Sequence, residues 1–467
     1  MAWWVGQREV EQAGSVLFRG AIPPRIENFS FLEKREIEIR PRAARDDCHW
    51  SADLLHPRFG KATLLCRPDV RLPPHCVIDI DPRLTPEERT NAKLAGGMLS
   101  ILVPARSGNV LRDRKDLLWY LRAVMADDGL AGMDLLSQSI WSAEGLDDEL
   151  AHDADLDIDA VHTLHLLYDD ASAKGEPSGD APGEGHTTYW LHSHGFKELG
   201  FWDYDILSPS AEYHGLGFDA LRALAFAIVE EKLKPGDGPC SIARQAAVSA
   251  VAARDCLAQL EAGRYEKYLK SVDDLHLDGH GVICDPISRG FLARVLAWTK
   301  PRPSTFFQGP PPKELLVWFS NSATELMAKR ARETVGILRT AFEQLRELEY
   351  PALVKLGYVV DGGGPDDREH LWFEVHGFQG ESVDATLVNQ PYAVSSLSEG
   401  CRGLYPLELL TDWTIMTPAG HINPRQTRTL RFVREHFAEL RDAIREDRSQ
   451  GRPEQNGPSR TAPQPER

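Results

Sequence analysis

The chain has 467 residues, 42% of them hydrophobic and 26% charged, as in an ordinary water-soluble globular protein, and this length predicts about two to four domains. Its 70 aspartates and glutamates outnumber its 53 lysines and arginines, which gives a net charge of −17. Such a charge repels nucleic-acid phosphates and anionic lipid, and the sequence contains no local basic patch. We therefore expect neither a nucleic acid nor a membrane as a partner.

The N-terminus and the cysteines favour a cytoplasmic location. Residues 1–9 lack a basic segment followed by an apolar run, so we expect no signal peptide. No apolar stretch reaches the length of a membrane span. The seven cysteines are scattered without CxxC spacing, which favours reduced thiols over a disulfide framework or a zinc knuckle.

After an N-terminal segment, residues 1–29, the sequence predicts an α+β unit over residues 30–140. Residues 85–88 form a helix start, because a Thr at the N-cap, a Pro in the first turn and a Glu at the third helical position make a capping box. A second helix is expected over residues 113–126, where leucines recur at helical spacing. The strand candidates of this unit are residues 29–40, 62–70, 76–80 and 98–103.

A second α+β unit is predicted over residues 155–300. Two apolar runs, residues 161–168 and 187–192, flank a loop at residues 171–185 whose Gly, Pro, Ser and acidic residues predict mobility. We expect the two runs to pair as a hairpin. Large apolar and acidic residues alternate over residues 201–206, as in a half-buried strand. A helix over residues 218–234 and a strand over residues 281–284 follow.

The C-terminal part is predicted to contain a strand and a long helix at residues 313–350, then a module at residues 352–446. Residues 322–325 form a capping box, and apolar residues from Met327 to Leu345 lie on one helical stripe. Residues 448–467 are polar and Pro-rich, which predicts a disordered tail. The fold class is therefore α+β, multi-domain, with mixed and antiparallel sheets, packed helices and a small, mostly-β C-terminal module followed by a helix.

The clearest motifs lie in this module. Residues 369–378 (EHLWFEVHGF) precede residues 383–391 (VDATLVNQP), residues 407–413 (LELLTDW) and residues 420–428 (GHINPRQTR). In this order they resemble domain of unknown function 2314, a small bacterial domain that is also called the YegJ-like family. The resemblance covers roughly residues 352–434. The resemblance implies a mostly-β module with a helix and no agreed activity.

Two segments bear on the extent of this resemblance. Residues 398–403 (SEGCRG) depart from the family pattern, in which a Gly is followed by an acidic residue and a polar strand. Residues 189–206 more loosely resemble the segment that precedes the domain in a second uncharacterised bacterial family, domain of unknown function 4026.

Within the module, Trp372, Asp412 and Trp413 are the candidate ligand-binding residues. A structural role is favoured for the Asp412-Trp413 pair. An Asp at a strand end caps backbone N–H groups, and a Trp supplies much of the buried area of a small core.

A metal site is the alternative hypothesis for the middle region. His192 and His194 are two apart on a strand, so both imidazoles share a face and could bind one divalent ion. Asp203 and Asp205 have the same spacing on the neighbouring strand and could complete the set. His162 and His165 are three apart and are predicted to point to opposite faces. No HExxH motif, P-loop or Gly-x-Ser-x-Gly elbow occurs, and no other cofactor is expected.

These observations favour an uncharacterised cytosolic bacterial protein that binds a partner protein or a small ligand without catalysis. An immunity-like role is an analogy only. The alternative is a metal-dependent hydrolase centred on His192 and His194.

Overall fold

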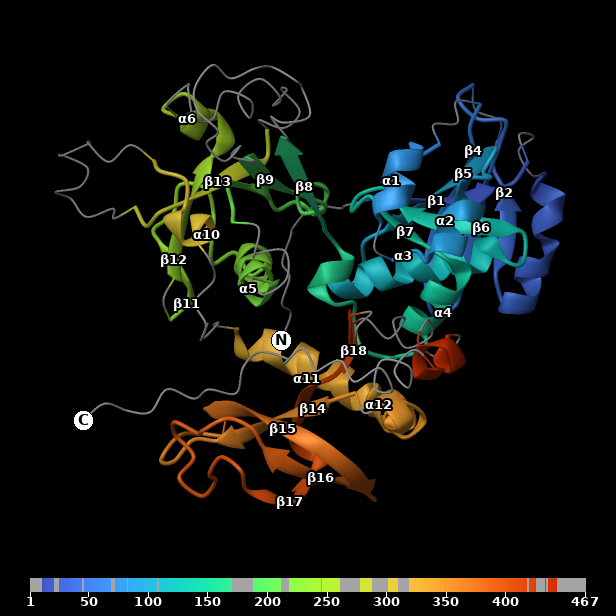
Figure 1. The fold of residues 1–467 in the computed structure, drawn as a ribbon. Helices are drawn as coiled ribbons and strands as arrows, with labels where there is room; N and C mark the ends of the chain where they lie inside the picture. The colour runs from blue at the N-terminus through green and yellow to red at the C-terminus, as the bar shows by residue number, and fades with distance from the viewer. Residues whose placement is uncertain are drawn as a thin grey trace. The chain divides into compact units, whose positions relative to one another are not determined.

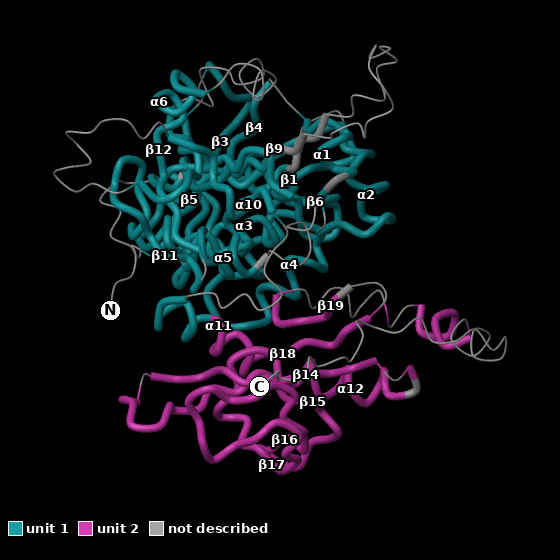
Figure 2. Tube along the Cα trace, turned by 60° about the vertical axis from the view of Figure 1, so that its left-hand side comes forward, with its two compact units in different colours: residues 1–326 teal, residues 327–467 magenta. Residues whose placement is uncertain are grey.

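The computed structural model describes most of the chain, and every structural statement below concerns these residues. The described residues are 11–20, 25–43, 46–68, 72–81, 83–106, 109–169, 188–210, 218–244, 246–260, 278–287, 301–309, 319–348, 350–365, 367–417, 420–425, 433 and 436–442. The chain divides into two compact units, residues 1–326 and 327–467 (Figure 2). Each unit is described by itself.

Unit 1 begins with a seven-stranded antiparallel sheet in the order β2-β3-β4-β5-β1-β6-β7 (Figure 1). Its strands are β1 (Glu11–Phe18), β2 (Glu38–Pro41), β3 (Trp50–His56), β4 (Gly60–Cys66), β5 (Gly97–Pro104), β6 (Gly129–Asp134) and β7 (Ser139–Trp141). Its helices are the 3-10 helix η1 (Ile26–Arg35), α1 (His75–Ile80), α2 (Pro86–Ala92), α3 (Val110–Met125) and α4 (Ala143–Leu150). Helix α3 packs on β1, β5 and β6 and buries its leucines in the main core.

The predicted helix start at residues 85–88 is confirmed, the helix predicted over residues 113–126 begins earlier, at Val110, and two strand predictions are wrong. Thr85 Oγ1 accepts a hydrogen bond from the backbone N–H of Glu88 (3.1 Å), and Thr85 N–H donates to Glu88 Oε2 (2.6 Å), which completes the capping box. Residues 76–80 belong to helix α1 (His75–Ile80), whose N-cap is Pro74. Most of residues 29–40 lies in the 3-10 helix η1, and β2 covers only the end of that range.

The second sheet of unit 1 has six strands in the order β11-β12-β13-β10-β9-β8. The strands are β8 (Thr163–Asp169), β9 (Thr188–His194), β10 (Asp203–Leu207), β11 (Cys240–Ala243), β12 (Ala246–Ala252) and β13 (His280–Cys284). The predicted hairpin is confirmed, because β8 and β9 pair antiparallel along their whole length. Strands β10 and β13 are parallel, while the other neighbours are antiparallel.

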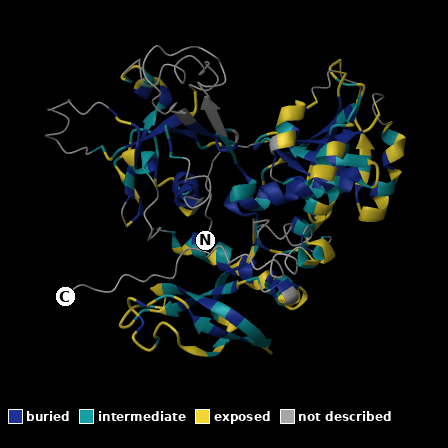
Figure 3. Ribbon diagram, viewed as in Figure 1, coloured by how far each residue is buried: buried dark blue, intermediate teal, exposed yellow. Residues whose placement is uncertain are grey.

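Helices cover both faces of this sheet. Helix α5 (Phe218–Val229) packs in the main core, where Leu191, Tyr204 and Ile206 point. Helix α6 (Ala253–Leu257) lies with a smaller cluster on the other face, which contains Trp190, Leu207 and Val282. The strands between them are largely buried (Figure 3). The remaining short helices of unit 1 are η2 (Ile158–Ala160), η4 (Lys197–Leu199) and α10 (Thr305–Gln308).

Unit 2 is a six-stranded antiparallel sheet in the order β17-β16-β15-β14-β18-β19. Its strands are β14 (Ala352–Val359), β15 (Arg368–Gln379), β16 (Ser382–Leu387), β17 (Arg402–Pro406), β18 (Leu410–Thr417) and β19 (Gly420–Ile422). Its helices are α12 (Val335–Gln344), η6 (Arg346–Leu348) and η7 (Leu407–Leu409), and α11 (Asn321–Glu333) spans the division between the units. Apolar residues of α12 and one sheet face form the core, which Phe437 and Leu440 also contact.

The α+β fold class is confirmed, including the β-rich C-terminal region followed by a helix. The predicted single long helix is instead two helices, α11 and α12, which meet at Thr334. Ser320 Oγ accepts from the backbone N–H of Ala323 (3.0 Å), so Ser320 rather than Ser322 caps α11. Three predicted segments lie outside the described residues: the loop at residues 171–185, the first part (residues 313–318) of the strand-and-helix segment at residues 313–350, and the tail at residues 448–467. Within the described ranges, no helix has both the length and the hydrophobicity needed to cross a bilayer.

Candidate metal centre

Three buried donor residues converge on the α6-covered face of the second sheet. His192 on β9 lies directly opposite Asp205 on β10, and the parallel register places Asp205 beside Val282 on β13. His280 is two residues before Val282 and therefore shares its face. One donor atom from each of His192, Asp205 and His280 lies within 4.8 Å of the other two. Their exposed fractions are 2%, 1% and 5%.

The carboxylate of Asp205 is the centre of this cluster. Its Oδ1 atom lies 2.5 Å from His192 Nδ1 and accepts a hydrogen bond from Trp190 Nε1 (2.9 Å). Its Oδ2 atom lies 3.9 Å from His280 Nδ1. The rings of His192 and His280 are nearly parallel, with centroids 4.8 Å apart. Trp190 thus orients a carboxylate that lies between two imidazoles.

The donor set fits a first-row transition-metal ion. Zinc bonds to imidazole nitrogen and carboxylate oxygen are about 2.0–2.2 Å long, so two donors on a tetrahedral ion lie about 3.4 Å apart. The donor atoms lie within 4.8 Å of one another, so the most widely separated pair would have to approach by at most about 1.4 Å to reach that value. Imidazole favours zinc, copper, nickel or iron, whereas magnesium and calcium prefer a shell of oxygen ligands.

Two further histidines border the three donors. His194 is half-buried, and its ring centroid lies 4.3 Å from that of His192 and 6.4 Å from that of His280. His165 on β8 lies directly opposite His192 in the hairpin, and its ring is 5.2 Å from that of His194. Burial, with a smaller contribution from His192, lowers the pKa of His165 below its ordinary value, which favours the neutral imidazole that binds metals.

His162 lies apart from this cluster. Its Nδ1 atom is 2.9 Å from the carbonyl oxygen of Ile158, and its ring stacks on Phe196 with centroids 4.5 Å apart. Burial lowers the pKa of His162 to about 4. Both contacts are structural, so His162 serves the packing of the sheet.

Asp203, predicted as a fourth donor, has a different environment. Its Oδ1 atom accepts hydrogen bonds from Ser193 Oγ (2.9 Å) and the backbone N–H of Phe196 (3.2 Å), and its Oδ2 atom accepts from the N–H of Lys197 (3.2 Å). Asp203 is part of β10 and pairs with His280 of β13, but these three hydrogen-bond donors already occupy its carboxylate. This carboxylate holds the turn that follows β9.

Sequence reasoning missed His280, and it set His165 aside because it compared His165 only with His162. His280 lies far along the chain, and only the parallel pairing of β13 with β10 brings it to the site. The one local signal is that it immediately precedes the strand predicted over residues 281–284, whereas the observed strand β13 begins at His280. His165 was visible only through the predicted hairpin, which places it opposite His192.

In unit 2 the three predicted ligand-binding residues do not converge. Trp413 is fully buried in the core, and its Nε1 donates to Thr334 Oγ1 (2.9 Å). Trp372 and Asp412 each lie opposite Lys355 on the other face of the sheet, and the Lys355 ammonium is 5.1 Å from the Trp372 ring centroid. The geometry supports a core role for Trp413. Trp372 and Asp412 are half-buried and lie on either side of Lys355 on the opposite face of the sheet.

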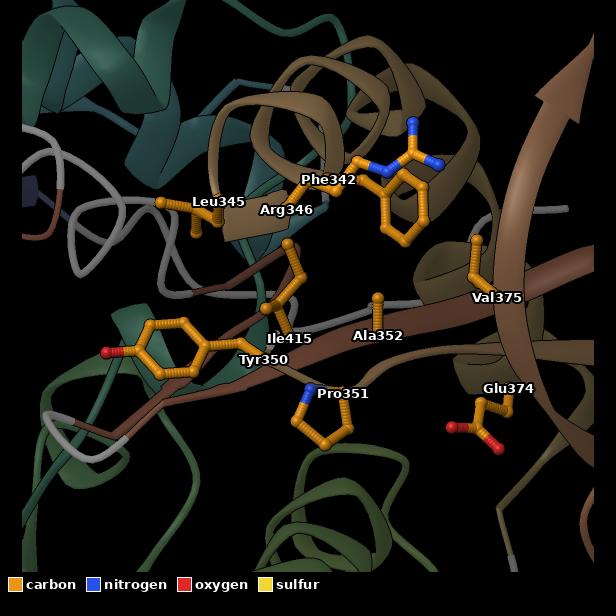
Figure 4. A pocket seen from close by; sticks show the side chains of 9 residues that line it. All are labelled: Phe342, Leu345, Arg346, Tyr350, Pro351, Ala352, Glu374, Val375 and Ile415. Atoms are coloured by element: carbon orange, nitrogen blue, oxygen red, sulfur yellow. The ribbon is translucent and has the colours of Figure 1, made fainter. Parts of the chain in front are cut away.

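A small pocket of about 210 Å³ opens between the end of α12 and the sheet of unit 2 (Figure 4). Its floor is apolar, formed by Ala352, Val375 and Ile415. Arg346 on the helical side and Glu374 on β15 stand at different sides of it. The volume is below the roughly 300–1,000 Å³ of typical ligand pockets, so it suits one side chain better than a cofactor.

Comparison with known proteins places only the C-terminal region. Residues 322–443 match a family described as an uncharacterized protein conserved in bacteria (DUF2314). The match confirms the resemblance found in the sequence and extends it over α11 and α12, beyond the expected residues 352–434. The looser resemblance of residues 189–206 to domain of unknown function 4026 is not supported by a match. No curated protein and no solved structure matched the chain.

Proposed function

We propose that this protein binds one divalent transition-metal ion in unit 1 through His192, Asp205 and His280. The observation that carries the proposal is the convergence of three buried donors from three adjacent strands. Among the described residues, no other group of His, Cys, Asp and Glu meets this geometry, so the proposal assigns the metal to unit 1 and not to the family-matched unit 2.

Electrostatics favours an ion over a simple hydrogen-bonded pair. A buried carboxylate loses its hydration and needs compensating charge or several donors. A divalent ion would neutralise Asp205 while both imidazoles stay neutral. The competing explanation is a charged His192–Asp205 pair, which the 2.5 Å contact also allows. The two explanations differ in one respect, because only the first requires His280.

Binding is favoured over hydrolysis by the surroundings of the donors. A hydrolytic ion keeps an open coordination position for water and substrate. Here all three donors are buried, and Trp190, Leu207 and Val282 form an apolar cluster on the same face. This supports an ion that is held without an open position for substrate, and the proposal keeps the non-catalytic function expected from the sequence. We also propose that unit 2 binds a protein or a small ligand, as expected from the sequence.

The test is metal analysis of the full chain after chelation and reloading with zinc or cobalt. We expect about one ion per chain in the wild type and loss of the ion in the Asp205→Asn and His280→Ala variants. His370→Ala is the matched control, because His370 is a half-buried sheet histidine of unit 2. A reloaded wild type without metal, or a His280→Ala variant that keeps the ion, would overturn the proposal.

A further inference from the structure

The histidines of this face form a series that runs from the edge of the sheet inward. His165 lies on β8, the edge strand, and His194 and His192 lie on β9, the next strand. His165 and His194 are partly exposed, whereas His192 and His280 are buried. Any ion that reaches the buried donors from this edge meets His165 and His194 first.

Two of the three successive ring spacings fall in the range of imidazoles that share an ion, and the third is about 0.2 Å shorter than that range. With metal–nitrogen bonds of about 2.1 Å, two rings on one ion have centroids roughly 4.5–5.2 Å apart. The successive separations are 5.2 Å for His165–His194, 4.3 Å for His194–His192 and 4.8 Å for His192–His280. The next-nearest pair, His194 and His280, is 6.4 Å apart, too far for adjacent positions on one ion.

We propose that His165 and His194 form the entry route by which the metal ion reaches His192, Asp205 and His280. This inference rests on the proposed metal binding. At each step one metal–nitrogen bond forms while one metal–water or metal–nitrogen bond breaks, so the charge of the ion is unchanged. The buried Nε2 atom of His165 makes no hydrogen bond to any described residue, so no bond within the described structure has to be broken before it binds an incoming ion.

The route acts on the rate of loading and not on the final affinity. His165 is a transfer residue that is not bonded to the ion in its final position. Removing it should slow both association and dissociation and leave their ratio nearly constant. A residue that only supports the fold would not produce that pattern.

The experiment is stopped-flow mixing of the chelated full-length chain with Co²⁺, followed by the visible absorption of the bound ion. His165→Ala should reduce the association rate constant by about tenfold or more and change Kd by less than about threefold. His370→Ala should behave as the wild type. Millimolar imidazole should restore part of the lost rate in His165→Ala, because it replaces the missing ring, and this rescue also shows that the variant is folded.

The outcomes separate the two proposals. A wild type that binds no Co²⁺ refutes the metal site itself. A wild type that binds Co²⁺ while His165→Ala associates at an unchanged rate refutes the entry route alone. An unchanged association rate with a Kd raised tenfold would make His165 a ligand of the final site, which also overturns the route.

Discussion

Asp203 and Asp205 have the same residue type and similar burial, and the structure assigns them opposite roles. Replacing Asp203 by Asn keeps one oxygen acceptor but turns an amide NH₂ toward one of the two backbone N–H donors, that of Phe196 or that of Lys197. A buried hydrogen bond to a charged group contributes about 1.5–3 kcal/mol. Loss of the charge and of one acceptor should therefore cost about 2–4 kcal/mol of local stability.

Hydrogen exchange measured by mass spectrometry on the full chain can detect this loss in one region. A cost of 2–4 kcal/mol corresponds to about 30- to 1,000-fold less protection in peptides that cover β9, η4 and β10. We expect Asp203→Asn to show that loss and still to bind about one metal ion per chain. We expect Asp205→Asn to lose the metal ion and to show a smaller loss of protection. Normal exchange in Asp203→Asn together with a lost ion would refute the assignment and restore Asp203 as a ligand.

Three further predictions concern the packing. Thr334→Val leaves the buried Nε1 of Trp413 without its acceptor and should destabilise unit 2 by about 1–3 kcal/mol, measured by hydrogen exchange in β18. Gly195→Ala places a Cβ atom 2.4 Å from the carbonyl oxygen of Val161 at a φ of +124°, so the variant should unfold at clearly lower temperature or remain insoluble. Burial lowers the pKa of His162 from 6.5 to about 4. Because the unfolded chain binds the proton more readily, the free energy of unfolding should fall by up to about 3 kcal/mol as the pH drops from 6.5 to 4. In urea titrations at several pH values, His162→Phe should show a weaker dependence on pH.

The sequence predicted those elements whose pattern is local. The capping box at Thr85, the hairpin of β8 and β9 and the helix over Val110–Met125 follow from turn chemistry and from side-chain periodicity within one segment. The prediction failed at residues 76–80, where a short apolar run has the composition of a strand. Five residues cannot distinguish a period of two from one of 3.6, so composition alone could not decide between a strand and a helix.

The candidate site was predicted only in part because it is assembled by tertiary pairing. His192 and Asp205 could be found, since both lie on predicted neighbouring strands. Asp203 was included because it is two residues from Asp205 on the same predicted strand; in the structure its carboxylate accepts hydrogen bonds from Ser193, Phe196 and Lys197. His280 could not be found, because no local pattern indicates that β13 aligns parallel with β10.

The parallel pairing of β10 and β13 also bears on how the protein folds. Two parallel strands cannot be joined by a tight turn, and here the connection includes α5, β11 and β12. His280 therefore reaches Asp205 only after that long connection has closed, which is an entropically costly and slow event. The donor set should be complete only late in folding, so uptake of an ion during refolding would mark the moment at which the second sheet acquires its native order.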